Sequence, residues 1–157
     1  MLKEIETYLS FLNDLRGQVK TLLEGLPKEA LDWKPLEGQG ELATNSPAIM
    51  AIHLAGSEAF WIKEIIGKQS IQRDRDAEFV AKGLGFSELA AKLEAGVKDS
   101  TAILSSLTPA QLEETRKFRD RTVTVRWGIL HIIEHYAIHV GHLQLTRQLW
   151  QAKSGKK

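Results

Sequence analysis

The stretch that decides the fold is residues 126–150, RWGILHIIEHYAIHVGHLQLTRQLW. It holds four of the chain's five histidines: His131, His135, His139 and His142. Because an α-helix turns about 100° per residue, offsets of four, eight and eleven positions return these side chains to an arc about 80° wide. The sequence therefore predicts a long helix, ending near Ala152, with a stripe of imidazoles on one face.

Three further stretches carry apolar residues at steps of three and four, which is typical of amphipathic helices. They cover residues 2–26, 47–66 and 86–107. Together with the histidine-rich helix they predict an all-α fold, a four-helix bundle with long connecting loops. We expect a single domain over residues 1–152 and a flexible basic tail over residues 153–157.

Local signals indicate where these helices begin. Ser46 and Thr108 are each followed by proline, so a capping side chain precedes a residue suited to the first turn. Ser87 is expected to cap the third long helix. Residues 117–125 have high β-propensity, but an unpaired strand is not stable, so we expect an extended lead-in to the last helix.

Composition excludes several classes of function. The 157 residues carry a formal charge of +1 and no basic stripe, so a nucleic-acid partner is not expected. The chain has no cysteine, which excludes disulfides, a thiolate metal site and a cysteine nucleophile and fits a cytoplasmic protein. No apolar run approaches 18 residues and the first residues do not resemble a signal peptide, so no membrane partner is expected.

The fifth histidine, His53, lies on the predicted core face of residues 47–66. Burying several imidazoles costs about 1–3 kcal/mol each unless every one finds a partner, and a metal ion would satisfy several at once. We therefore predict a buried metal site where two helices meet. The alternative is a purely structural bundle with a polar histidine seam.

Helical spacing alone leaves the ligand set open, because His135 has a neighbour one turn away on each side, His131 and His139. The segment His131-Ile-Ile-Glu134-His135 also matches the H-x-x-E-H motif of inverted zinc peptidases. That class requires a further acidic ligand downstream, and no Asp or Glu follows Glu134. A ferritin-like di-iron site is excluded, because it requires Glu-x-x-His motifs and the chain has none.

A single ion held by three neutral imidazoles is the site that remains. Nitrogen ligands suit zinc, nickel, copper or iron. Three protein ligands with one open position are typical of a catalytic site, where the open position takes water or a substrate group. We assign no catalytic residue, because Glu134 falls about 60° from the nearest histidine of the stripe.

Three motifs in order resemble those of the DinB/YfiT-like metal-binding four-helix bundles. They are Leu31-Asp-Trp33-Lys-Pro35, then Ser46 followed by Ile52-His53-Leu54, then His135-Tyr-Ala-Ile-His139-Val-Gly141. The resemblance implies that the metal ligands are His53, His135 and His139. It implies zinc or nickel first, with iron as a third option. His131, His142 and Trp33 would then support the ligands, line the pocket or belong to the core.

Members of this family with an assigned activity use a low-molecular-weight thiol, such as bacillithiol or mycothiol, whose pKa the metal lowers. The resemblance thus implies a metal-dependent thiol S-transferase or a related hydrolase acting on a small molecule. The alternative is a non-catalytic, metal-stabilised module that binds a small molecule or serves a stress response. Small bundles of this kind often pair, so a homodimer is also expected.

Overall fold

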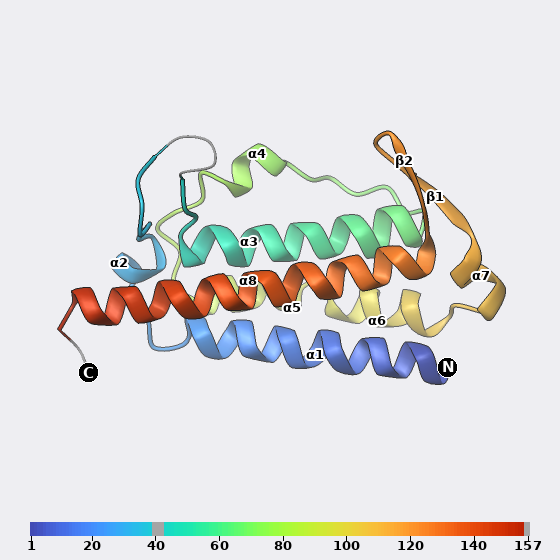
Figure 1. The fold of residues 1–157 in the computed structure, drawn as a ribbon, viewed down its shortest axis with the longest axis horizontal. Coiled ribbons are helices and arrows are strands. Elements are labelled where there is room, and N and C mark those ends of the chain that lie inside the picture. Colours follow the sequence, from blue (N-terminus) through green and yellow to red (C-terminus); the bar gives the residue numbers. More distant parts are fainter. Residues whose placement is uncertain (39–42, 156–157) are drawn as a thin grey trace.

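The computed structural model describes residues 1–38 and 43–155, which form an elongated helical bundle (Figure 1). The elements, in chain order, are α1 (Lys3–Leu23), α2 (Lys28–Leu31), α3 (Pro47–Glu58), the π-helix η2 (Ala59–Ile66), α4 (Arg75–Glu78), α5 (Phe86–Glu94), α6 (Val97–Ser105), α7 (Pro109–Glu113), β1 (Thr115–Phe118), β2 (Arg121–Thr124) and α8 (Val125–Lys153). The described part of the chain contains no helix long and apolar enough to cross a membrane.

The predicted all-α four-helix bundle is confirmed. Helix α8 runs the length of the molecule between α1 and α3, and α5 and α6 complete the bundle (Figure 1). The third predicted helix is divided into α5 and α6 at Ala95 and Gly96, where a glycine weakens helix formation. The core contains apolar side chains from every long helix, among them the fully buried Leu12, Leu54 and Ile132.

Helix α3 continues into η2 without a break. In the π-helix the hydrogen bonds span one residue more than in an α-helix, and the N–H of Gly67 donates to the carbonyl oxygen of Ile62 at 2.9 Å. A Cβ atom at Gly67 would lie 2.8 Å from the carbonyl oxygen of Lys63, so only glycine fits there. The predicted end of this helix at Ile66 is confirmed, but its last eight residues have the wider geometry.

Two of the three predicted caps are confirmed. The hydroxyls of Ser46 and Thr108 accept hydrogen bonds from backbone N–H groups in the first turns of α3 and α7. The prediction for Ser87 is wrong, because α5 begins one residue earlier at Phe86. There the Glu88 carboxylate accepts the backbone N–H of Gly85 at 2.8 Å.

The prediction that residues 117–125 form an unpaired, extended lead-in to the last helix is wrong. The segment belongs to a β-hairpin in which β1 and β2 pair antiparallel, with Phe118 opposite Arg121. The segment contains the second half of β1, the turn and β2, and Thr115 and Arg116 just before it complete β1. Arg119 takes a left-handed conformation (φ 56°) in the turn. Phe118 packs on Trp61 of η2 with ring centroids 4.5 Å apart, so the hairpin does not stand alone.

The boundaries of the predicted tail and loop are only partly within the described residues. Lys153 is the last residue of α8, so the helix reaches one residue beyond the predicted boundary at Ala152. Lys156 and Lys157 of the tail lie outside the described residues, as do residues 39–42 of the loop between α2 and α3.

A buried carboxylate joins four elements on the side of α8 away from the histidines. Glu58, the last residue of α3, accepts hydrogen bonds from Arg16 of α1 (2.5 and 3.0 Å), Ser100 of α6 (2.7 Å) and Tyr136 of α8 (2.8 Å). The side chains of Arg16 and Glu58 are only 6% and 4% exposed. Burial and the carboxylate of Glu58 raise the pKa of Tyr136 well above its usual value, which keeps its hydroxyl a donor.

Glu58→Gln should lower the free energy of unfolding by about 3–5 kcal/mol, because it leaves the Arg16 guanidinium buried without its counter-charge. The matched control is Glu94→Gln, which breaks the exposed Lys20–Glu94 ion pair (2.6 Å) and should cost about 1 kcal/mol or less. Urea denaturation of the three proteins measures both values. Equal losses for the two variants would show that the Glu58 cluster does not hold the bundle.

Candidate metal centre

Three histidines meet where α3 packs on α8. His53 lies in the middle of α3, and His135 and His139 lie one turn apart on α8. One ring nitrogen from each lies within 4.8 Å of the others. Nε2 of His53 and Nε2 of His135 are 3.2 Å apart, and the rings of His135 and His139 have centroids 4.6 Å apart. The structure thus brings together the set that the resemblance implied.

This geometry fits a metal ion. Two nitrogens that each lie about 2.0–2.1 Å from one ion at a tetrahedral angle are about 3.3 Å apart, close to the His53–His135 separation. The Nδ1 atoms of His135 and His139 are buried and find no hydrogen-bond partner among the described residues. Leaving buried ring nitrogens without a partner is costly, and a metal ion is a partner that a cluster of imidazoles could bind.

The three imidazoles are held in the neutral form that metal coordination requires. Burial, with the neighbouring rings of His139 and His53, lowers the pKa of His135 to about 3. Burial and the adjacent His53 lower the pKa of His139 to about 4. Burial also lowers the pKa of His53, outweighing the attraction of Glu78.

Glu78, at the end of α4, orients His53. Its Oε2 atom lies 3.0 Å from Nδ1 of His53, which leaves Nε2 facing the other histidines. Arg73 holds the same carboxylate through two hydrogen bonds of 2.6 and 2.8 Å and also donates to Ser57. Burial acts to raise the pKa of Glu78, but the hydrogen bonds from Arg73 and His53 hold it below its usual value. A carboxylate on the second ring nitrogen fixes the ring and makes it a stronger ligand.

Gly56 makes this contact possible. It lies one turn after His53 on α3, and a Cβ atom there would be 2.1 Å from Oε1 of Glu78. Any larger residue would push the Glu78 carboxylate away from His53. The glycine costs some helix stability and allows α4 to approach the helix closely.

His131 lies apart from the three clustered histidines. Its ring stacks on Trp127 at an interplanar angle of 10° and meets the edge of Trp61, with both centroids 4.9 Å away. Its Nδ1 atom is 3.6 Å from the exposed carboxylate of Glu134. Aromatic rings therefore occupy the surroundings of His131, and it faces the hairpin end of the molecule.

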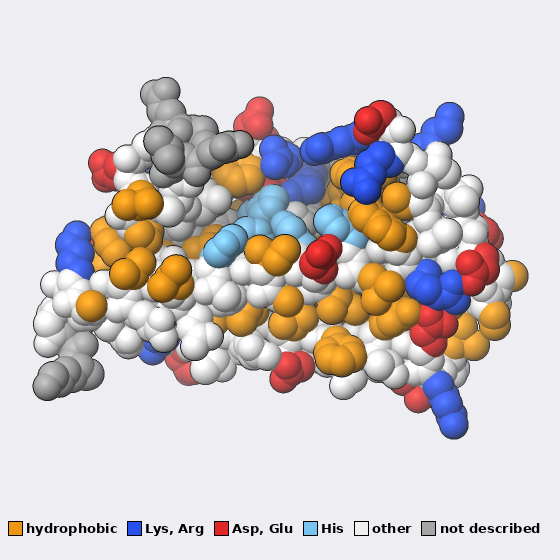
Figure 2. Space-filling model, viewed as in Figure 1, with side chains coloured by type: hydrophobic (Ala, Val, Ile, Leu, Met, Phe, Trp, Pro, Cys, Tyr) orange, Lys and Arg blue, Asp and Glu red, His pale blue; other side chains and the backbone are white. Residues whose placement is uncertain are grey.

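His142 and Trp33 line an apolar pocket of about 610 Å³ that opens beside His139. His142 is exposed, with its ring 5.7 Å from that of His139. Trp33 packs against Trp150 at 5.5 Å. The rest of the pocket wall is mainly apolar, with Pro35, Leu36, Met50, Leu145 and Leu149. The space-filling view shows the histidines near one another at the surface, with hydrophobic side chains on both sides of them (Figure 2).

Two residues of the site were missed in the sequence. Neither Arg73 nor Glu78 belongs to a motif that marks it in the sequence. Glu78 lies 25 positions from His53, so no helical spacing relates them. One signal was present: Gly56 in the middle of an apolar helix marks a place where another part of the chain approaches closely.

Comparisons with known proteins agree with this architecture. The sequence profile of the mycothiol-S-transferase family matches residues 7–152. The uncharacterized protein YkkA of Bacillus subtilis (strain 168) is 28% identical, with 94% of this chain and 97% of that protein covered. A DinB-like protein from Bacillus cereus ATCC 10987 has a similar structure, with a TM-score of 0.72 at 15% identity, covering 97% of this chain and 93% of that one.

A second solved structure, the DinB-like protein YjoA of Bacillus subtilis, gives a TM-score of 0.67 at 20% identity and covers 96% of this chain and 93% of that one. These two structures show that the bundle is the DinB-like fold. The family profile covers nearly the whole chain, including all three clustered histidines. The chain therefore belongs to the mycothiol-S-transferase family of DinB-like proteins.

Proposed function

We propose that this protein is a metal-dependent S-transferase that joins a low-molecular-weight thiol to a small electrophile. The observation that carries the proposal is the cluster of three imidazoles within 4.8 Å of one another, in a chain of a transferase family. His53, His135 and His139 would hold the ion, with zinc or nickel favoured and iron as the third option. A related hydrolytic reaction is the alternative use of the same centre.

A divalent ion with three imidazole ligands supplies an open position and lowers the pKa of a group bound there. The chain's own residues prepare that position. Glu78 fixes the ring of His53, and burial keeps the imidazoles unprotonated. The pocket beside His139 would exclude water from the apolar part of the electrophile.

The proposed reaction balances without any redox partner. The S–H bond of the thiol and the bond from carbon to the leaving group break, and a C–S bond forms. The proton and the leaving group depart as the conjugate acid. No cysteine of the chain takes part, because the sequence has none, so the thiol comes from outside.

The ligand set is tested by elemental analysis of protein purified without a nickel column or chelator. We expect about one divalent ion per chain, lost in His139→Ala and retained in His131→Ala, because only the former ring belongs to the cluster. The two substitutions remove the same side chain from the same helix, four residues on either side of His135. Loss of metal in both variants, or in neither, would contradict the assignment.

The role of Glu78 is tested by a substitution at Gly56, the residue that leaves space for the Glu78 carboxylate. Gly56→Ala should displace the Glu78 carboxylate and weaken metal affinity about 10–100-fold in a competition assay with a chelator. Gly17→Ala is the matched control, because a Cβ atom there has no neighbour within 4 Å. It should stabilise α1 by about 0.5–1 kcal/mol and leave metal affinity unchanged. Unchanged affinity in Gly56→Ala would remove Glu78 from the site.

Activity is tested with metal-loaded and metal-free protein, a set of low-molecular-weight thiols and an apolar aryl halide, 1-chloro-2,4-dinitrobenzene. We expect thioether formation that requires the metal and is lost in His139→Ala. Full activity in metal-free protein would overturn the proposal. Bound metal that raises the melting temperature without turnover of any thiol would indicate a non-catalytic module instead.

A further inference from the structure

We propose that a second cleft at the metal centre binds the negatively charged part of the thiol, which is a small molecule carrying carboxylate or phosphate groups. This inference rests on the proposed function and deepens it. The cleft has a volume of about 640 Å³ and lies between η2, the connection from η2 to α4, and the β-hairpin. His53 and His135 form part of its wall, so a ligand in this cleft reaches the cluster from the side opposite the apolar pocket.

The charge of this cleft is one-sided. Among the residues that the structure describes, five charged side chains line it: Arg73, Arg75, Lys117 and Arg119 are cations, and Glu64 is the only anion. The whole chain has a formal charge of only +1, so this is a local concentration of positive charge. Figure 2 shows Lys and Arg side chains gathered beside the histidines, with hydrophobic side chains next to them.

The cations of the cleft have different partners. Arg73 is neutralised by Glu78. Arg75 and Arg119 rest on aromatic rings, with their guanidinium carbons 4.9 Å from the ring centre of Phe79 and 5.2 Å from that of Phe118. Within the described chain neither guanidinium forms an ion pair with a carboxylate.

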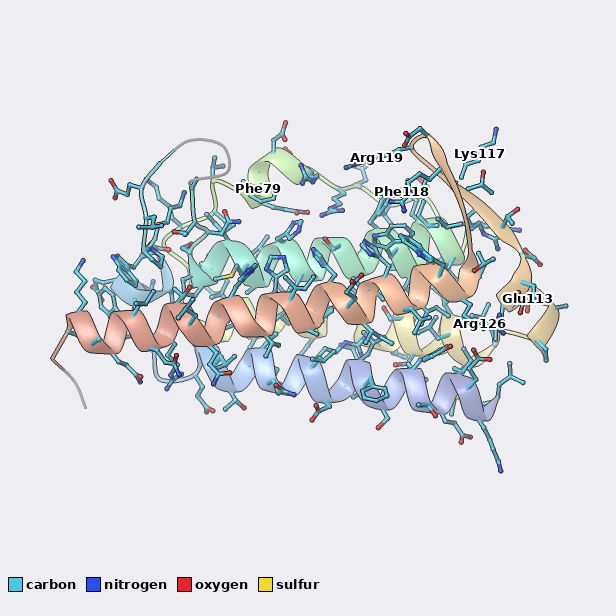
Figure 3. The ribbon with its side chains drawn as sticks, viewed as in Figure 1. Phe79, Glu113, Lys117, Phe118, Arg119 and Arg126 are labelled. Carbon is cyan, nitrogen blue, oxygen red and sulfur yellow. The ribbon has the colours of Figure 1, made fainter. Side chains whose placement is uncertain are left out.

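These two arginines approach from different elements. Arg75 belongs to α4, which also carries Glu78, and Arg119 lies in the turn of the hairpin. Figure 3 shows Phe79 on the α4 side and Phe118 with Arg119 on the hairpin side. A guanidinium presents a planar fork that matches carboxylate and phosphate groups, and stacking on a ring limits its freedom before a ligand arrives. The pair is therefore suited to hold an anion from both sides.

The opposite pocket has the complementary character. Among the described residues that line it, none is Lys, Arg, Asp or Glu. His139 lines that pocket, whereas His53 and His135 line the basic cleft. The clustered histidines thus lie between an apolar side and a cationic side. The charged reactant belongs in the cleft and the apolar electrophile in the pocket, with the sulfur and the reacting carbon meeting between them.

The test compares two thiols that differ in charge. Mercaptosuccinate carries two carboxylates, and 1-thioglycerol carries none. Isothermal titration calorimetry on the metal-loaded protein should show mercaptosuccinate binding at least about fivefold more tightly than 1-thioglycerol. The double variant Arg75→Gln/Arg119→Gln should weaken mercaptosuccinate binding about tenfold and leave 1-thioglycerol binding within about twofold.

Arg121→Gln is the control for charge alone, because it removes a positive charge from the same hairpin outside the cleft. Arg121 lies over the ring of Trp127 at 5.4 Å and does not line the cleft. This variant should bind both thiols as the wild type does. Equal loss of mercaptosuccinate binding in this control would indicate general charge attraction and overturn the inference.

The outcomes separate this inference from the proposed function. If neither thiol binds the metal-loaded wild type, the proposed function fails. If both thiols bind equally, or the double variant binds mercaptosuccinate normally, the basic cleft is not the anion site while the transferase proposal stands. Succinate, which has the two carboxylates and no thiol, gives a readout in metal-free protein. Its NMR-detected binding should be weakened by the double variant and not by Arg121→Gln.

Discussion

The buried carboxylate of Glu58 is the interaction on which the rest of the structure depends. A carboxylate removed from water must be paired and hydrogen-bonded, and Glu58 finds its partners on three other helices. Tyr136, which donates to it, is the neighbour of His135. Fixing the hydroxyl of Tyr136 on one side of α8 fixes the rotation of the helix. The imidazoles of His135 and His139 are thereby aimed at His53 across the helix contact.

The same orientation of α8 gives the two sides of the histidine cluster different surroundings. Beyond His139 the helix faces the loop that carries Trp33, and the wall is apolar. Toward its N-terminal end α8 faces η2 and the hairpin, where arginines rest on aromatic rings. The histidines of α8 are separated by three or four residues, yet they lie in different environments. Similar spacing in the sequence therefore does not mean that these histidines have the same role.

Local patterns predicted the four-helix bundle and the stripe because both depend on helical periodicity. His53 was expected on the core face, and it lies there. Spacing could not separate His139 from His131, and the resemblance did so. Trp127, one turn before His131, was a local sign that this ring stacks on an aromatic neighbour. The partners of Glu58 lie 42 or 78 positions away, and such pairings leave no periodic trace.

Because η2 is a π-helix, the structure around residues 59–66 depends on the number of residues in this segment. A π-turn holds one residue more than an α-turn, so deleting one residue between 59 and 66 would restore α geometry. The wider turn takes up the extra residue, so the chain after it would keep its direction relative to His53, but the side chains of η2 that line the basic cleft would change places. Relatives that differ by a single-residue gap here could keep the same imidazoles and yet accept a different ligand.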